Sequence, residues 1–224
     1  MNCLTFVQRL ARRCRLCAAG VFLTLAGGCG ALSPTTTPQP SFYALDNARI
    51  EARAATLPAA ALPQTAPTLI VNPPHAASGI TSQRIIYVRE AHKLEYFAHS
   101  EWVDPPARML APLIVAALEN SGAFRAVVLA PSAAAGDLRL DTEIIRLQHE
   151  FHAQPSRVRF TLRAYVVEDK TRRVLAWREF DATVPAASEN PYGGVVAANQ
   201  AVQTVLENLS AFCVEAARGA RMEK

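Results

Sequence analysis

The fold class follows from "RVRFTLRAYVV", residues 157–167, in which apolar and polar side chains alternate. Because successive side chains of a β-strand point to opposite faces of a sheet, one face of this strand enters the core and the other meets water. The core face consists of five apolar residues: Val158, Phe160, Leu162, Ala164 and Val166. A strand with one buried face and one wet face is typical of antiparallel sheets.

Two neighbouring stretches extend this strand into an antiparallel meander. Upstream, "DLRLDTEIIRL" (137–147) alternates until Ile144 and Ile145, where the phase changes and predicts a β-bulge or twist. Downstream, "EDKT" (168–171) predicts a turn that leads into a third strand, "RRVLAWREFDATV" (172–184). The sequence therefore predicts three consecutive strands in one sheet.

Shorter β-rich stretches predict the remaining strands. "QRIIYVRE" (83–90) and "KLEYFAH" (93–99) are joined around Ala91 and His92, and this pattern predicts a β-hairpin. Three further stretches predict single strands: "FYALD" (42–46), "TLIVNP" (68–73) and "FRAVVLA" (124–130).

The first predicted helix follows the hairpin. Asp104 is its predicted N-cap, and Pro105 and Pro106 fit the first turn, where a missing N–H is tolerated. Asn120–Gly122 is the predicted stop. Pro112 lies between these limits and predicts a kink or a later start, because proline removes one backbone hydrogen bond from a helix.

The second predicted helix runs from about Tyr192 to Ala217, and its apolar seam suits a helix that lies across a sheet. The seam consists of Val195, Val202, Val205, Leu206, Leu209, Phe212 and Cys213. Together, these elements predict an α/β fold: a two-layer sandwich with a mostly antiparallel or mixed sheet and two main helices packed on one face.

The N-terminal segment, residues 1–28, has the features of an export signal. It carries four arginines and no acidic residue, and the run "LCAAGVFLTLAGG" (16–28) that follows the arginines is apolar or small. Because a membrane span needs roughly 20 apolar residues, this shorter run predicts a cleaved signal peptide. The alternative is a short membrane anchor that stays attached.

The predicted signal leads into "AGGC" (26–29), which resembles a bacterial lipobox. The resemblance implies that Cys29 becomes the mature N-terminus and carries several acyl chains, which anchor a protein more stably than one chain does. Gly30 follows in place of aspartate, which implies sorting to the bacterial outer membrane, with the domain facing the periplasm.

The predicted layout after the signal has a tether, a domain and a tail. Residues 29–41 form a flexible Pro/Thr-rich tether, in which the twelve residues after the cysteine reach roughly 37 Å when extended. Residues 42–218 form the domain, with a mobile Ala/Pro-rich excursion over 46–67. Residues 219–224 form the tail.

Charge and cysteine content exclude several classes of function. Four of the 23 Lys and Arg residues lie in the signal, so the rest of the chain has 19 basic and 19 acidic residues. This balance leaves no basic footprint for nucleic acid. Beyond residue 28 only Cys29 and Cys213 remain, and the position of Cys213 on the helix seam predicts a buried thiol without a disulfide.

The residue patterns predict no catalytic or cofactor site. No G-x-S-x-G, S-x-x-K or G-x-x-x-x-G-K-[ST] motif occurs, so the signatures of hydrolases and nucleotide-binding proteins are absent. His149 and His152 form an H-x-x-H pair, but side chains three residues apart on a strand point to opposite faces. We therefore predict no enzymatic activity, no cofactor and no metal.

An arginine row on the wet face of the 157–167 strand is a candidate contact for anionic lipid headgroups or an acidic partner. The row consists of Arg157, Arg159 and Arg163. The favoured alternative is pairing with acidic residues of neighbouring strands, which stabilises each pair only slightly. Those acidic residues are Asp141, Glu143, Glu179 and Asp181.

Three aromatic residues in the predicted hairpin and at its exit are the other candidate contacts. Tyr87, Tyr96 and Trp102 are of the residue types that anchor interfaces. Half-buried core aromatics are the equally common alternative for such positions.

Three stretches, taken together, resemble the ABC-type transport auxiliary lipoproteins, the PqiC-like family. They are "FYALD" (42–46), "SQRIIYVREAHKLEYFAHSEWVDPP" (82–106) and "LIVAALENSGAFRAVV" (113–128), and the likeness covers roughly residues 42–215. The resemblance implies an outer-membrane lipoprotein without catalytic residues. It also implies partners: an MCE-domain protein and an inner-membrane ABC permease and ATPase, in systems that move lipids or other hydrophobic molecules between membranes.

The resemblance allows a homo-oligomer as well, and places the aromatic hairpin residues among the contacts. The rival hypothesis is an assembly or pilotin-like lipoprotein of another envelope machine, without lipid cargo, because an α/β sandwich alone does not define a function.

Overall fold

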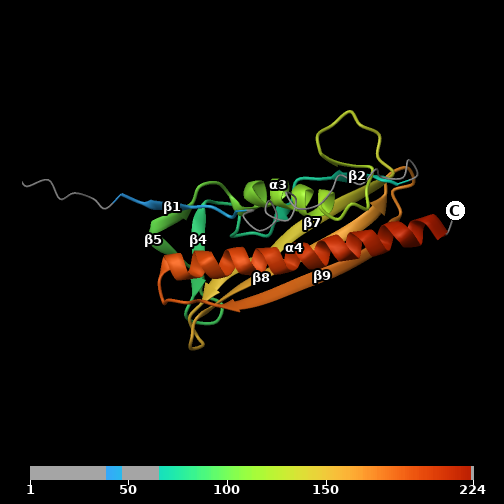
Figure 1. The fold of residues 1–224 in the computed structure, drawn as a ribbon. Coiled ribbons are helices and arrows are strands. Elements are labelled where there is room, and N and C mark those ends of the chain that lie inside the picture. The colour runs from blue at the N-terminus through green and yellow to red at the C-terminus, as the bar shows by residue number, and fades with distance from the viewer. Residues whose placement is uncertain (1–38, 47–65, 223–224) are drawn as a thin grey trace, which may run out of the picture. The chain divides into compact units, whose positions relative to one another are not determined.

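The computed structural model describes residues 39–46 and 66–222, and all of these except Gln39 belong to one compact unit, Pro40–Lys224 (Figure 1). Four predicted features lie outside the described residues: the signal peptide (1–28), the lipidation of Cys29, nearly all of the tether (29–41) and nearly all of the excursion (46–67).

Three long strands form the predicted antiparallel meander. They are β7 (Leu138–Glu150), β8 (Arg157–Glu168) and β9 (Val174–Pro185), and β8 lies between the other two. The register of β7 against β8 shifts between Ile144 and Arg146, which confirms the predicted bulge. Because the bulge inserts one residue, the apolar side chains on either side of it stay on the same face of the sheet.

The other edge of β7 is shared by three short strands that run parallel to it. In order along β7 these are β2 (Thr68–Val71), β3 (His75–Ala76) and β4 (Arg84–Val88). The thirteen residues of β7 make it long enough to pair with all three in succession. The chain therefore returns three times to the same strand edge.

Two wings complete a nine-stranded mixed sheet. At one end of β7, β2 pairs with β6 (Ala126–Leu129). At the other end, β4 pairs in the predicted hairpin with β5 (Glu95–Trp102), and β5 pairs with the edge strand β1 (Ser41–Tyr43).

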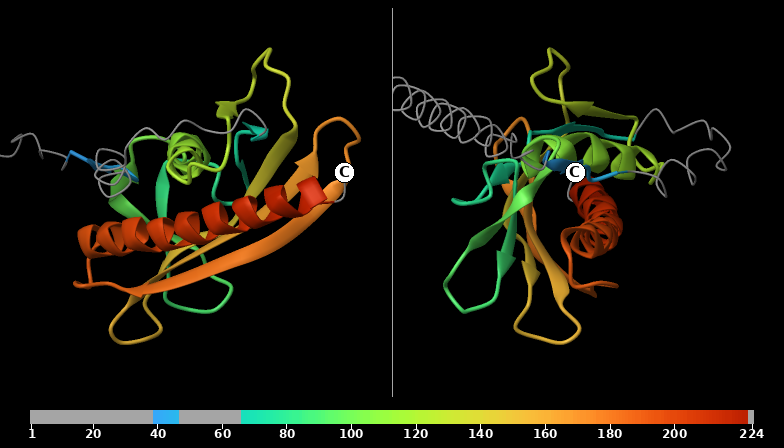
Figure 2. Two further views of the ribbon diagram at one scale, coloured as in Figure 1. Left: turned by 45° about the vertical axis from the view of Figure 1, so that its right-hand side comes forward. Right: turned by 90° about the vertical axis from the view of Figure 1, so that its left-hand side faces the viewer.

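Two helices pack against this sheet, as the sequence predicts (Figure 2). The long helix α4 (Pro191–Met222) lies along β8 and β9, and α3 (Pro106–Glu119) lies nearer β6 and β2. The core faces of β8 and α4 are buried as predicted. Their buried residues are Val158, Phe160, Leu162, Ala164, Val166, Val195, Val202, Val205, Leu206, Leu209, Phe212 and Cys213.

The boundaries of the helices differ in detail from the prediction. The N-cap of α3 is Pro105 and not Asp104. Pro105 precedes Pro106, and a residue that precedes proline avoids the helical region, so the first helical residue is Pro106. Asp104 instead forms an ion pair with Arg108, at 3.3 Å between Oδ1 and Nη1. Pro112 lies inside α3 without delaying its start. It is exposed, so the carbonyl that its missing N–H would have bonded can be hydrated.

The C-terminal ends of both helices are also defined. Asn120 is the C-cap of α3 and Gly122 adopts a φ of 63°, as expected for the predicted stop. Helix α4 continues beyond the predicted end at Ala217 to Met222, because the added residues, Gly219 apart, are good helix formers.

The fold predicts a large difference between two leucine positions. Leu162 in β8 is fully buried, whereas Leu129 in β6 is 39% exposed. We expect Leu162→Ala to lower the free energy of unfolding by about 2–5 kcal/mol, because it leaves a cavity in the core. Leu129→Ala, the matched control, should change it far less. Urea denaturation followed by circular dichroism measures both, and equal losses would contradict this assignment of the core.

Candidate functional site

The three aromatic candidates occupy different environments. Trp102 ends β5 with 3% of its surface exposed, and it belongs to the hydrophobic core, so in this structure it is a packing residue and not an available contact. Tyr87 in β4 is also buried, at 9% exposed. Tyr96 in β5 is 37% exposed, and the guanidinium carbon of Arg84 lies 5.1 Å from the centre of its ring. Only Tyr96 of the three offers a substantial surface to a partner.

Tyr87 is held in a cluster of rings at the hairpin end of β7. The centre of its ring lies 4.6 Å from that of Phe97 and 5.9 Å from that of Phe151. Its hydroxyl accepts a hydrogen bond from Arg89 Nη2 at 3.0 Å and lies 3.4 Å from Glu95 Oε1. These contacts fix the hairpin against β7, which is where Tyr87 pairs with His149.

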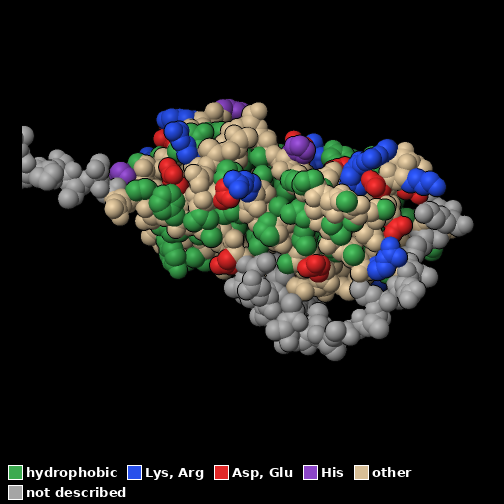
Figure 3. Space-filling model, turned by 90° about the horizontal axis from the view of Figure 1, so that it is seen from above, with side chains coloured by type: hydrophobic (Ala, Val, Ile, Leu, Met, Phe, Trp, Pro, Cys, Tyr) green, Lys and Arg blue, Asp and Glu red, His purple; other side chains and the backbone are tan. Residues whose placement is uncertain are grey.

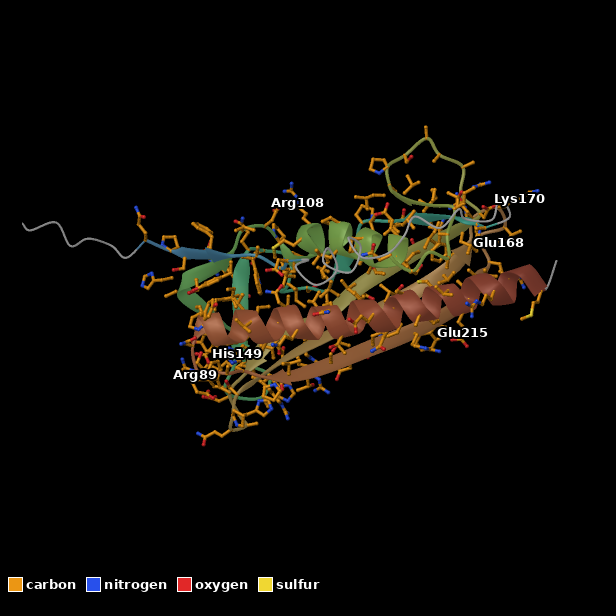
Figure 4. The ribbon with its side chains drawn as sticks, viewed as in Figure 1. Arg89, Arg108, His149, Glu168, Lys170 and Glu215 are labelled. Carbon is orange, nitrogen blue, oxygen red and sulfur yellow. The ribbon has the colours of Figure 1, made fainter. Side chains whose placement is uncertain are left out.

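His149 lies at the centre of this region, beside the N-terminal end of α4 (Figure 4). Its ring is 2% exposed, and its Nε2 lies 2.8 Å from the hydroxyl of Ser156. The backbone N–H of Ser156 donates to Glu189 Oε1 at 2.8 Å. Gly194 of α4 lies so close to the ring that a Cβ there would come within 2.5 Å of His149 Nδ1. Any larger residue at position 194 would therefore clash with the His149 ring.

The Ser156–His149–Glu189 cluster is a structural clamp. A nucleophilic serine has to be accessible to its substrate, but Ser156 is fully buried. Glu189 bonds the backbone of Ser156 and not His149 Nδ1, which has no hydrogen-bond partner. The cluster thus joins β7, the loop before β8 and the segment before α4.

The arginine row forms ion pairs across the sheet, as the favoured alternative predicts. Arg159 Nε lies 3.1 Å from Asp181 Oδ1, and Arg163 Nη2 lies 2.9 Å from Glu179 Oε2. Arg163 also lies 3.6 Å from Glu143 through its Nη1. The neighbouring carboxylates thus balance the charges of the arginine row, and the role of the row in binding a partner or lipid stays a prediction.

Arg157, the first member of the row, pairs with a residue that the sequence did not single out. Its Nε lies 3.1 Å from Oε2 of Glu150 at the end of β7, whose side chain is 4% exposed. His152 Nε2 lies 3.5 Å from the same carboxylate oxygen. His149 and His152 thus have separate partners, Ser156 and Glu150, and point to different surroundings.

A groove of about 840 Å³ lies between α3 and α4, and no motif in the sequence predicts it. Six of its lining residues are Ala117, Ser121, Gln203, Glu207, Ala211 and Val214. Ser210, which also lines it, donates a hydrogen bond to the carbonyl of Ala117 at 3.2 Å. The groove depends on the packing of two helices that are far apart in the chain, which periodicity within one helix does not reveal.

The described part of the chain holds neither a cluster of metal ligands nor an accessible thiol. Among residues 39–46 and 66–222, no three His, Cys, Asp or Glu side chains gather as metal ligands would. Cys213 is 1% exposed, and burial raises the pKa of its thiol to about 12, which confirms the predicted buried thiol.

None of the helices in the described residues combines the length and the apolar character needed to cross a membrane.

Residues 44–210 match the family of ABC-type transport auxiliary lipoprotein components, so the chain belongs to that family. It is thus an auxiliary lipoprotein component of an ABC-type transport system, in agreement with the resemblance seen in its sequence. No curated protein matches the chain.

Two solved structures are similar to this chain over most of its length. Protein XCC0632 from Xanthomonas campestris, of the DUF330 family, is 23% identical, with 81% of this chain and 99% of that chain covered and a TM-score of 0.68. An uncharacterised protein is 13% identical, with 78% and 99% covered and a TM-score of 0.59. At these identities the similarity shows a common fold.

The buried clamp predicts a pH dependence of stability. Burial lowers the pKa of His149 below its ordinary value, and the opposing effect of nearby Glu189 is smaller. Below about pH 6.5, His149 therefore takes up a proton more readily in the unfolded chain than in the folded one. The neutral His149 ring contributes its full share to the stability of the fold above that pH, and this share is lost as the pH falls below it.

We expect His149→Gln to flatten the decrease in the free energy of unfolding between about pH 7.5 and pH 5.5. His152→Gln is the matched control, because the side chain of His152 is 46% exposed. Urea denaturation across this range measures the slope for each protein. The clamp interpretation fails if His149→Gln and the unmodified protein have the same slope.

Proposed function

We propose that this protein is a non-enzymatic, outer-membrane lipoprotein that faces the periplasm and serves an MCE-type intermembrane lipid transport system. The match of residues 44–210 to the auxiliary lipoprotein family carries this proposal. The export signal over residues 1–28 and the lipobox-like "AGGC" (26–29) support the location, because they lead from a secretory signal directly into a cysteine.

In this proposal Cys29 holds the acyl chains and residues 29–41 form the tether. The first strand, β1, begins at Ser41, so the folded domain (42–218) starts where the tether ends. Several acyl chains bind a membrane stably. The tether then keeps the domain at a high effective concentration near its partners, so each docking contact can be weak.

The proposed partners are an MCE-domain protein and an ABC permease with its ATPase. Of the predicted contacts, Tyr96 is the most exposed aromatic residue, and Arg157, Arg159 and Arg163 are partly exposed on the open face of the meander. Because each arginine is already paired with a carboxylate, docking through this row would exchange existing ion pairs for new ones.

Removing the lipidated residue tests the anchor. We expect Cys29→Ser to move the protein from the membrane fraction to the soluble periplasmic fraction, since no acyl chain can then be attached. The circular dichroism spectrum should be unchanged, because residue 29 precedes the first strand. Cys213→Ser is the control for loss of a thiol and should stay with the membranes. Retention of the Cys29→Ser protein in the membrane fraction would contradict the anchor.

Purification of the full-length lipoprotein from its own cells in mild detergent, followed by mass spectrometry, tests the transport system. Recovery of an MCE-domain protein together with lipid supports the proposal. Recovery of a secretin or another envelope machine, with no lipid beyond the anchor, overturns it in favour of the assembly lipoprotein.

A further inference from the structure

Exposed apolar side chains gather on the wing formed by β1 and β5. The described residues include nine large hydrophobic residues that are exposed, and four of them lie on this wing. These four, called the β1–β5 patch below, are Phe42 (57% exposed), Leu94 (48%), Tyr96 (37%) and Val103 (49%). Figure 3 shows hydrophobic side chains over the end of the unit that carries β1 and β5 in Figure 1.

The pairing of the strands places members of the patch on one face. Phe42 of β1 pairs with Glu101 of β5, and Glu101 also pairs with Arg84 of β4. Because paired residues of adjacent strands point to the same side of a sheet, Phe42 and Arg84 lie on the same side. The guanidinium of Arg84 then lies over the ring of Tyr96.

Leu94 and Val103 flank this row at the two ends of β5. Leu94 directly precedes the strand, and Val103 directly follows it and donates its N–H to the carbonyl of Tyr43 at 2.8 Å. The patch therefore combines aliphatic and aromatic side chains, and two charged side chains lie beside it on the same face: the guanidinium of Arg84 and the carboxylate of Glu101. Aromatic residues with a polar tip and long basic side chains are the types enriched where protein meets the headgroup region of a bilayer.

The position of the patch in the chain indicates its occupant. Phe42 is only thirteen residues from Cys29, and β1 is the strand into which the tether leads. Along the chain, β1 is the described strand nearest to Cys29, so an acylated Cys29 would attach the sheet to the membrane through this edge. Among the described residues β1 pairs with β5 on one edge alone, and its three residues are short for a protein interface built by strand addition on the other edge.

We propose that the β1–β5 patch rests in the headgroup region of the membrane that holds the lipid anchor. This inference depends on the proposed acylation of Cys29. The patch then sets the orientation of the domain: β1 and β5 face the membrane, and β9, at the opposite edge of the sheet, points away from it. The lipid anchor supplies the affinity for the membrane, so the four side chains only have to determine which surface of the domain faces it.

A tryptophan placed in the patch tests this orientation. Full-length lipoprotein carrying Phe42→Trp is reconstituted into vesicles of phosphatidylethanolamine and phosphatidylglycerol with brominated acyl chains, which quench nearby tryptophans. The matched control is Val174→Trp, because Val174 is 52% exposed and lies on β9. The emission of the unmodified protein, which contains Trp102 and Trp177, is subtracted in each case.

We expect several-fold stronger quenching at position 42 than at position 174, because an interfacial side chain lies roughly 5–10 Å into the boundary of the acyl chains. Equal quenching at both positions, or none at position 42, overturns the proposal. The proposal is also overturned if the tryptophan at position 42 becomes shielded from water only after the transport partners are added, because the patch would then bind protein.

Flotation of the same vesicles separates this inference from the anchor on which it depends. A protein that floats with the vesicles but shows no quenching at position 42 is anchored in another orientation, so only the patch proposal fails. A wild-type protein that does not float contradicts the acylated Cys29 itself. A protein that carries both Phe42→Ser and the second reporter Tyr96→Trp should still float with the vesicles. If the patch acts as one surface, its tryptophan at position 96 should be quenched less than in the protein that carries Tyr96→Trp alone.

Discussion

The hydrogen bonding of β7 on both of its edges is the constraint on which the rest of the structure depends. One edge pairs with β8 over nearly its whole length, and the other is divided among β2, β3 and β4. A buried strand cannot leave its backbone groups without partners, so the three short strands have to meet β7 in the correct order. Their order along β7 separates the β2–β6 wing from the hairpin wing.

The hairpin wing is where structural constraint and proposed function meet. Tyr87, Phe97, Phe151 and His149 pack at the end of β7, and Gly194 lets α4 approach the histidine ring closely. These contacts make the wing a fixed part of the fold, although the sheet order places it at an edge. A surface patch on a fixed wing can orient a tethered domain, because the patch keeps its direction relative to the core.

Electrostatics contributes balance more than attraction. After residue 28 the chain has equal numbers of basic and acidic residues, and the arginine row on the open face of the meander is paired with Glu150, Asp181 and Glu179. The two pairs of Arg159 and Arg163 are partly exposed on both sides and add little stability, but the row as a whole leaves no large field of one sign. Within the proposed function, this balance favours docking through shape and apolar contacts, with the proposed lipid anchor supplying proximity.

Local periodicity was enough to predict the three long strands, the bulge near Ile144, the hairpin, both helices and the buried seam of α4. Alternation and helical spacing are properties of neighbouring residues, so no knowledge of distant contacts is needed. The family was likewise readable from short motifs, whereas the signal peptide over residues 1–28 and the lipidation of Cys29 stay predictions. Long-range packing is what buries Trp102, pairs Arg157 with Glu150, brings His149 to Ser156 and Gly194, and forms the groove between α3 and α4. Each of these depends on which strands pair and how the helices lie across them, and such long-range placement has no signature within a single segment.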